Sequence, residues 1–265
     1  MNIIVCVKQV MDPEAPPRSL KIDSDKNIVS YSADVRPVID PYSEYAVEAA
    51  LKLKDAHGGT VTALSLGGKI DREVMRKPLS MGADALVLVE DGVFSGGDSY
   101  ITASALACAI QKLGGYDLIL CGRQSADRDA GQTGPGIAVL LGLPVVTMAK
   151  SIEVSGNKAI VERVAGDACE GIEVLLPAVI TVSHEIGAPR YPSVRGIMAA
   201  KKKEPVVWKP ADIGFKPDAA GVPGRISLLK MFQPARGTKC QLITGETPED
   251  AGVKLADILR QAKLI

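Results

Sequence analysis

The sequence predicts an α/β fold: a doubly wound parallel sheet with antiparallel edge strands, followed by a C-terminal arm. Over about the first 185 residues, short apolar runs bounded by turn residues alternate with segments of helical periodicity. This alternation is typical of βαβ units with parallel strands. Between residues 186 and 247, seven prolines interrupt a segment with little periodicity. We therefore expect an α/β domain over residues 1–185 and an arm with a final helix over residues 186–265.

Composition limits the classes of function. The 265 residues are 46% hydrophobic, enough for a substantial core. Lys+Arg and Asp+Glu both total 31, a balance that argues against non-specific nucleic-acid binding. No run approaches the roughly 20 apolar residues of a membrane-spanning helix, and the N-terminus enters a strand-like run without a signal peptide. The five cysteines lack metal-site spacing, so we expect a reducing, cytoplasmic setting.

Apolar runs predict the strands. Short runs rich in Val, Ile and Leu between turn residues suit buried parallel strands. Such runs are Asn2–Val7, Thr60–Leu66, Ala85–Val89, Leu118–Cys121 and Val145–Thr147. Alternating runs predict antiparallel edge strands, at Ile152–Val154, Ala159–Val164 and Gly171–Leu175. Two further alternating runs, Lys21–Asp23 and Asn27–Val29, suggest a small hairpin.

Apolar residues at helical spacing predict the helices. We expect Ser43 to cap the first helix, Asp98 or Ser99 to cap the third, and Pro78 to kink or shorten the second. The predicted helices are Glu44–Asp55, Asp71–Ser80, Tyr100–Leu113, a helix containing Ile137–Leu141, and Pro248–Lys263.

The stretch Asp117–Leu141 carries the clearest candidate binding site. A strand, a polar loop and a helix start follow one another there, and the first N–H groups of a helix attract anions. Glycines let the backbone approach a ligand, Thr133 can donate to a phosphate, and Arg123 and Arg128 add positive charge. The alternative is a helix start with a glycine-rich turn, since neither G-x-G-x-x-G nor a Walker loop is present.

A second glycine-rich stretch, Phe94–Ser104, precedes the third predicted helix. Gly96–Gly97 would let the backbone approach a second ligand, and a helix starting near Ser99 would offer free N–H groups to a pyrophosphate. Ser99, Thr102 and Ser104 add hydroxyl groups. A simple glycine turn with an Asp or Ser cap is the alternative.

The sequence offers little for catalysis by side chains. There are two histidines, His57 and His184, and no nucleophile with a recognisable base. We therefore expect no catalytic residues and no metal site. The pattern favours a protein that binds cofactors, which carry the chemistry themselves.

Several motifs in order resemble the small (beta) subunit of electron-transfer flavoproteins. The segment Gly122–Gly134, G-R-Q-S-A-D-R-D-A-G-Q-T-G, is similar to that family's nucleotide-binding segment. The resemblance includes V-C-V-K-Q-V at Val5–Val10, D-P-Y-S at Asp40–Ser43 and A-P-R-Y at Ala188–Tyr191. It implies an adenine-nucleotide-binding sheet and a heterodimer with a larger alpha subunit that holds one FAD.

The resemblance also implies which residues contact nucleotides in this chain. They lie in the motifs above, at the second strand end and in the Phe94–Ser104 stretch. The expected contacts are Val7, Asp40, Pro41, Tyr42, Ser43, Leu66, Phe94, Gly96, Gly97, Asp98, Ser99, Thr102, Arg123, Gln124, Asp127, Asp129, Ala130, Gly131, Gln132, Thr133, Gly134 and Pro135.

Members of this family differ in the nucleotide that they hold. One branch holds AMP; the flavin-bifurcating branch holds a second FAD that NADH reduces. Phe94–Ser104 resembles the segment that lines the NADH site in bifurcating members, so we expect FAD with transient NAD, and AMP as the alternative. Ala188–Lys203 corresponds to the docking loop for a flavin-containing dehydrogenase, with Val194 in place of a leucine. An adenine-nucleotide sensor of the universal-stress type would share the fold without electron transfer.

Overall fold

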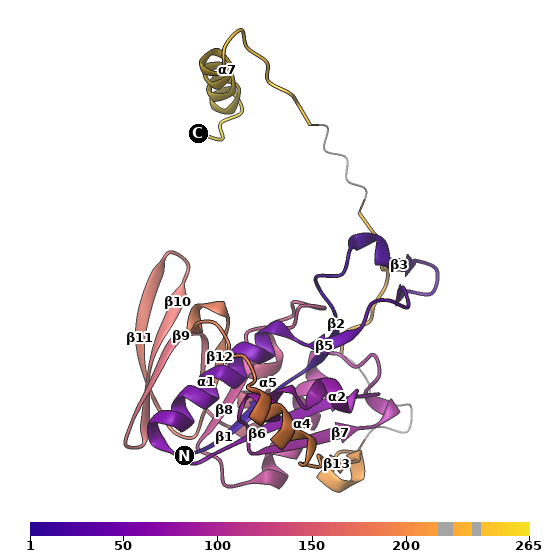
Figure 1. Ribbon diagram of the computed structural model, residues 1–265, viewed down its shortest axis with the longest axis vertical. Helices are drawn as coiled ribbons and strands as arrows, with labels where there is room; N and C mark the ends of the chain where they lie inside the picture. Colours follow the sequence, from indigo (N-terminus) through magenta and orange to yellow (C-terminus); the bar gives the residue numbers. More distant parts are fainter. Residues whose placement is uncertain (217–224, 235–239) are drawn as a thin grey trace. The chain divides into compact units, whose positions relative to one another are not determined.

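A computed structural model describes residues 1–216, 225–234 and 240–265 (Figure 1). These residues form two compact units. The larger comprises Met1–Lys21 and Val29–Leu229; the smaller comprises Ile22–Ile28 and Lys230–Ile265. The larger unit contains the sheet and the candidate site.

The larger unit is built on one sheet, in which nine strands of the described residues pair. The strands from β9 to β13 in the sheet order run parallel, and β10 and β11 extend the sheet as antiparallel strands. The order is β11 (Ala168–Leu175), β10 (Lys158–Ala165), β9 (Val145–Ser155), β12 (Ala178–Val182), β8 (Leu118–Gly122), β1 (Asn2–Cys6), β6 (Thr60–Gly67), β7 (Ala85–Glu90) and β13 (Val206–Trp208).

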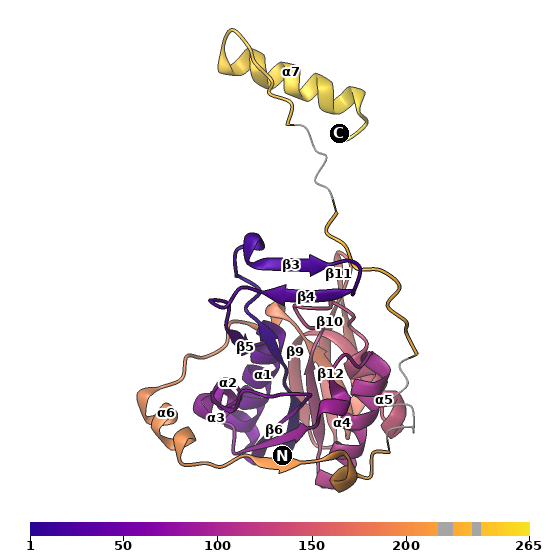
Figure 2. The ribbon, with the colours of Figure 1, turned by 90° about the vertical axis from the view of Figure 1, so that its right-hand side faces the viewer.

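Helices cover both faces of this sheet (Figure 2). On one face lie α1 (Pro41–His57), α2 (Arg72–Met75), α3 (Lys77–Met81) and α6 (Val194–Lys201). On the other lie α4 (Ser99–Leu113) and α5 (Thr133–Leu141). Each face has its own apolar core. The doubly wound α/β prediction is therefore confirmed.

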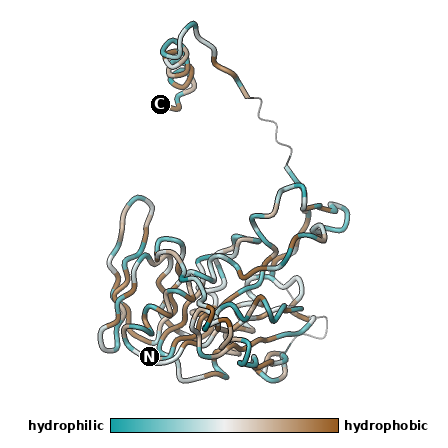
Figure 3. Tube along the Cα trace, viewed as in Figure 1, coloured by the Kyte–Doolittle hydropathy of each residue, from teal (hydrophilic) through white to brown (hydrophobic). Residues whose placement is uncertain are grey.

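The central strands are apolar on both sides because helices cover both sides. Val5, Leu120 and Ile180, on β1, β8 and β12, are fully buried toward the α1 face. Ile119 and Val179 are equally buried toward the α4 face. The trace is correspondingly hydrophobic through the middle of the sheet (Figure 3).

Two predicted elements begin or end differently in the structure. Helix α1 begins at Pro41, and its cap is Asp40, whose carboxylate accepts a hydrogen bond from the Ser43 N–H. The prediction of Ser43 as the cap is wrong because Pro41 already fits the first helical position. The predicted strands Val145–Thr147 and Ile152–Val154 are one strand, β9. An irregularity at Met148, with φ of 61°, lets β9 pair with both β12 and β10.

The expected interruption at Pro78 is present. Helices α2 and α3 are separated at Arg76, and Pro78 occupies the first turn of α3, where a missing N–H costs nothing. Asp98 caps α4, as predicted, by accepting from the Ile101 N–H.

After Val182 the structure contains elements that the periodicity does not predict. The segment includes α6, then β13, which extends the sheet beside β7, and the 3-10 helix η4 (Pro210–Ile213). These elements are short, so their apolar residues show no period in the sequence. Two small antiparallel pairs complete the strands: β2 (Gln9–Met11) with β5 (Pro37–Ile39), and the predicted hairpin β3 (Leu20–Asp23) with β4 (Ile28–Tyr31). The final helix, α7 (Pro248–Gln261), forms as predicted.

Candidate functional site: a cavity at the carboxyl ends of the strands

A cavity of about 330 Å³ lies at the carboxyl ends of β1, β6 and β8. Segments that directly follow these strands line it, at Val7–Gln9, Gly68–Ile70 and Arg123–Ser125. The chain passes from α1 on one face to α4 and α5 on the other, so the sheet reverses its winding between β1 and β8. Ligands of open α/β sheets bind at such a switch point.

Most of the residues expected to contact nucleotides line this cavity. They come from five separate parts of the chain and meet here. The lining includes Val7, Asp40, Ser43, Leu66, Phe94, Gly96, Gly97, Asp98, Ser99, Thr102, Arg123, Gln124, Asp127, Ala130, Gly131, Gln132 and Thr133. Gly131 has a φ of 63°, a conformation that favours glycine, where the loop turns toward α5.

The other expected residues are not among those that line the cavity: Pro41, Tyr42, Asp129, Gly134 and Pro135. Gln124 Nε2 donates to the Tyr42 hydroxyl at 3.1 Å and to Asp129 Oδ1 at 2.8 Å. Pro41 is the first residue of α1, and Gly134 and Pro135 belong to the first turn of α5. Contact between any of these residues and a ligand stays a prediction.

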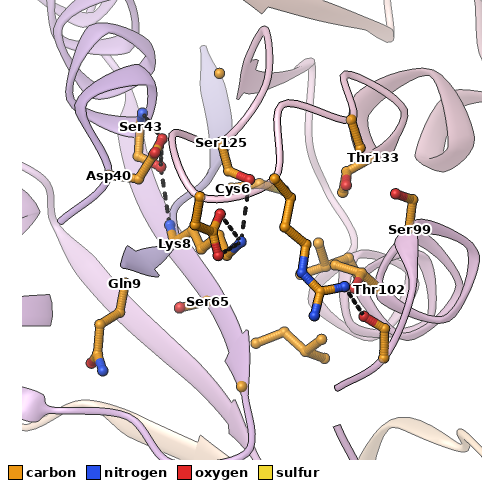
Figure 4. Close-up of a pocket in the computed structure, with 18 of the residues that line it drawn as sticks. Cys6, Lys8, Gln9, Asp40, Ser43, Ser65, Ser99, Thr102, Ser125 and Thr133 are labelled. Atoms are coloured by element: carbon orange, nitrogen blue, oxygen red, sulfur yellow. Dashed lines mark hydrogen bonds and ion pairs between the residues drawn. The ribbon is translucent and has the colours of Figure 1, made fainter. Parts of the chain in front are cut away.

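Lys8, the residue two positions after β1, is a charged residue in the lining that was not among the expected contacts. Its ammonium lies 2.5 and 2.7 Å from the two Asp127 carboxylate oxygens and 3.2 Å from the Ser125 hydroxyl. Burial by itself would raise the pKa of Asp127, but the Lys8 ammonium holds it below its ordinary value. Figure 4 shows Lys8 reaching toward Ser125, with Thr133, Ser99 and Thr102 across the cavity. The ion pair of Lys8 and Asp127 therefore places a charged donor, the Lys8 ammonium, just beyond the end of β1.

Asp40 ties three segments around the cavity together. Its buried carboxylate accepts from Ser43 N at 3.0 Å, from Ser43 Oγ at 3.3 Å and from Ala126 N at 2.8 Å. The Ser43 hydroxyl in turn accepts from Lys8 N at 3.0 Å. Burial raises the pKa of Asp40 despite these donors. The side chains of Asp40 and Ser43 therefore connect the start of α1, the end of β1 and the loop after β8.

Two cysteines contribute a neutral part of the lining. Cys6 and Cys121 are register partners on β1 and β8, and both line the cavity. The hydrogen bond to Cys121, together with burial, raises the pKa of the Cys6 thiol, which therefore stays protonated near neutral pH. With Leu66 and Phe94 they give the cavity an uncharged surface suited to a ring system.

The N-termini of α5 and α4, both at the cavity, differ in whether a side chain caps them. No side chain in the described part of the chain caps α5, its first turn holds no acidic residue, and its first residue, Thr133, lines the cavity. The N-terminus of α4 is closed by the Asp98 carboxylate, which accepts from the Ile101 N–H at 2.9 Å. The prediction of free N–H groups near Ser99 is thus wrong for Ile101. An anionic group is better accommodated at α5.

Several lining residues were absent from the expected contacts. They are Cys6, Lys8, Gln9, Ser65, Gly67, Gly68, Lys69, Ile70, Ser95, Leu106, Cys121, Gly122, Ser125 and Arg128. Some of them, such as Lys8, Gly68 and Ser125, lie one to three residues beyond a strand end, a position that could have indicated them. The others lie within strands or α4, or farther along the loops. The Arg128 guanidinium donates to the Gly97 carbonyl at 3.0 Å and so connects the two glycine-rich stretches.

Residues 1–216, 225–234 and 240–265 contain neither a cluster of metal-binding side chains nor a membrane-spanning helix. Within these ranges no group of three or more His, Cys, Asp or Glu side chains could hold a metal ion. None of their helices combines the length and apolar character that crossing a membrane requires.

Comparison with known proteins agrees with this geometry. Residues 29–213 match the electron transfer flavoprotein domain, and this match includes α1, α4, α5 and most of the cavity. This chain belongs to the electron transfer flavoprotein family. The resemblance found in the motifs is therefore confirmed.

Relatives within the family align over most or all of the chain. The caffeyl-CoA reductase-Etf complex subunit CarD of Acetobacterium woodii is 37% identical, covering 100% of both chains. An electron transfer flavoprotein subunit beta of Thermoanaerobacterium thermosaccharolyticum is 40% identical over 80% of this chain and 79% of its own. Protein FixA of Azorhizobium caulinodans is 34% identical over 100% of this chain and 96% of its own. The family's beta subunits are thus the chains that this one resembles.

Proposed function

We propose that this chain is the beta subunit of a heterodimeric electron-transfer flavoprotein, and that its cavity binds FAD. An alpha subunit with its own FAD would complete the heterodimer. The observation that carries the proposal is the cavity at the switch point, open to the uncapped N-terminus of α5. FAD supplies two-electron and one-electron chemistry, and the chain needs no catalytic side chain of its own.

The lining residues fit a dinucleotide by their chemistry. Thr133 and the first N–H groups of α5 suit a phosphate, and Arg128 and Lys8 add cationic groups elsewhere in the lining. Cys6, Leu66 and Phe94 provide the uncharged wall that a flavin or adenine ring requires. Hydrogen bonds to the Asp40 carboxylate, from Ser43 and Ala126, hold the start of α1 beside the loop after β8.

We assign NADH, transiently, to the Gly96–Gly97 side of the same cavity. Gly96, Gly97, Ser99 and Thr102 line it. Of these, Ser99 and Thr102 lie across the cavity from Lys8 (Figure 4). Electrons from NADH would then pass through this chain's flavin, and flavin-based bifurcation is the form of transfer that we favour. A relative named as part of a caffeyl-CoA reductase-Etf complex supports this branch. An AMP-binding subunit of a single-flavin carrier is the alternative.

Exposed apolar residues support two partner surfaces. On α6, Val194, Ile197 and Met198 are exposed at helical spacing, and Tyr191 just before α6 is 97% exposed. We propose this segment, within Ala188–Lys203, as the contact for a flavin-containing dehydrogenase. Helix α7 exposes Val253 and Leu255 and has no buried residue. We propose that α7 packs on the alpha subunit.

The test is to purify the heterodimer, denature it and count the released FAD and AMP. The intact protein is then titrated with NADH under anaerobic conditions while flavin absorbance is followed. We expect two FAD per heterodimer and bleaching by NADH. One FAD with one AMP and no response would establish the single-flavin alternative. Absence of any flavin and of any alpha partner would favour a nucleotide sensor.

A matched pair of variants tests the site assignment. Thr133→Val removes a hydroxyl from the cavity, whereas Thr60→Val removes one that donates to Asn2 at the opposite ends of the strands. Thr133→Val should lower nucleotide content after dialysis, and Thr60→Val should leave it unchanged. Equal nucleotide content in both variants would contradict the role of Thr133.

A further inference from the structure

The carboxylate of Asp98 joins the cavity to a distant segment of the chain. Oδ1 accepts from Ile101 N at 2.9 Å, at the start of α4. Oδ2 accepts from Arg225 N at 2.6 Å and from Ile226 N at 3.1 Å. The Asp98 side chain is buried, with 9% of the residue exposed. We call residues 225–229 the strap; they belong to the larger unit of the structure.

Ring contacts join the same two regions. The Arg225 guanidinium carbon lies 3.8 Å from the centroid of the Tyr100 ring, in the first turn of α4. The Phe215 ring, which follows η4, lies 5.6 Å from the Phe94 ring. Phe94 lines the cavity. The chain after β13 therefore contacts the cavity rim, residues 94–100, at both of its ends.

Sharing of one carboxylate makes the rim and the strap interdependent. If the strap departs, Oδ2 loses two hydrogen bonds from backbone N–H groups, a kind of bond that is stronger to a charged acceptor than to a neutral one. Burial by itself would raise the pKa of Asp98, but the surrounding N–H groups hold it below its ordinary value, so it stays charged at neutral pH. A charged Asp98 can therefore accept hydrogen bonds from the rim and from the strap at once.

We propose that Asp98 is a positioning residue that fixes the cavity rim by clamping the strap to it, and not a residue that contacts the ligand. In this way the chain leading to the C-terminal segment sets the place of Phe94 and Thr102 in the cavity. This role for Asp98 rests on the proposed function in one respect: that the cavity is the nucleotide site. It requires no particular nucleotide.

The experiment compares variants of the purified heterodimer by hydrogen–deuterium exchange and by nucleotide content after dialysis. Asp98→Asn keeps an oxygen for Ile101 but places an amide where Oδ2 accepts. Asp117→Asn is the matched control, because its exposed carboxylate accepts from Asn2 N at 2.7 Å at the other end of the sheet. Ile226→Pro removes one strap donor and leaves Asp98 and the α4 cap intact, so it serves even if Asp98→Asn fails to fold.

With Asp98→Asn, the strap amides should exchange about tenfold faster or more, as expected from losing hydrogen bonds to a charged group. Nucleotide retention should fall in parallel. Ile226→Pro should speed exchange at Ser227–Leu229, and Asp117→Asn should change neither quantity.

Unchanged strap exchange in Ile226→Pro and in a folded Asp98→Asn protein would overturn the proposal. So would faster exchange with unaltered nucleotide retention. Retention is measured for whichever nucleotide the heterodimer releases. A result of AMP in place of FAD would therefore refute the proposed function while leaving this comparison decisive.

Discussion

At the scale of single residues, the ion pair of Lys8 and Asp127 makes the stability of the folded protein depend on pH in the acid range. The folded-state pKa of Asp127 is lowered by Lys8 against the effect of burial. A lowered pKa contributes stability that is fully present above the ordinary carboxyl pKa, about 3.9, and is lost as pH falls toward the folded value. Asp127→Asn should therefore reduce the loss of stability below about pH 4.

Urea unfolding at a series of pH values between neutral and acid measures this dependence. Asp25→Asn, in the exposed turn of the β3–β4 hairpin, is the control for removing one carboxylate. Identical pH profiles for the wild type and Asp127→Asn would show that the ion pair does not contribute to stability.

Asp40 is the other decisive single residue. Asp40→Ala removes the cap of α1 and leaves the Ala126 and Ser43 N–H groups without their acceptor. Loss of a cap and exposure of buried donors should lower the free energy of unfolding by about 2–4 kcal/mol. Denaturant unfolding measures it, with Asp34→Ala in an exposed turn as the control. A change below about 0.5 kcal/mol, typical of surface positions, would contradict this account.

At the scale of elements, α5 reaches the cavity because glycine lets it lie close to the sheet. A Cβ on Gly134 would come within 2.6 Å of Thr181 Cγ2 on β12 and 3.4 Å of Cys121 Cβ on β8. Gly134→Ala should displace the start of α5, destabilise the protein by about 1–3 kcal/mol and lower nucleotide content. Gly171→Ala on β11, where an added Cβ meets nothing within 4 Å, is the matched control. Equal behaviour of the two variants would refute the packing argument.

At the scale of the whole molecule, the two units differ in how much apolar surface they bury within themselves. The larger unit has two apolar cores of its own, whereas α7 in the smaller unit has no buried residue. Deleting Phe232–Ile265 should therefore leave a folded sheet domain but abolish pairing with the alpha subunit. Circular dichroism and size-exclusion chromatography with the alpha subunit test both parts. Full co-elution of the truncated chain would contradict the role assigned to α7.

The sequence by itself determined the family and, along the chain, most of the strands and helices of the α/β domain. Runs such as Leu118–Cys121 and the amphipathic pattern of Pro248–Gln261 are local signals, so composition and period suffice to find them. The stretch Gly122–Gly134 was identifiable for the same reason. All of it is contiguous in the chain, and it lines or supports the cavity.

Only the tertiary structure decided which side chains meet. Lys8 and Asp127 are 119 residues apart, and Asp98 and Arg225 are 127 apart, so no periodicity connects them. The same holds for β13, whose three residues become a strand because β7 presents a free edge. Strand order places these distant groups at one end of the sheet, and strand order follows from packing both faces, which local sequence does not encode.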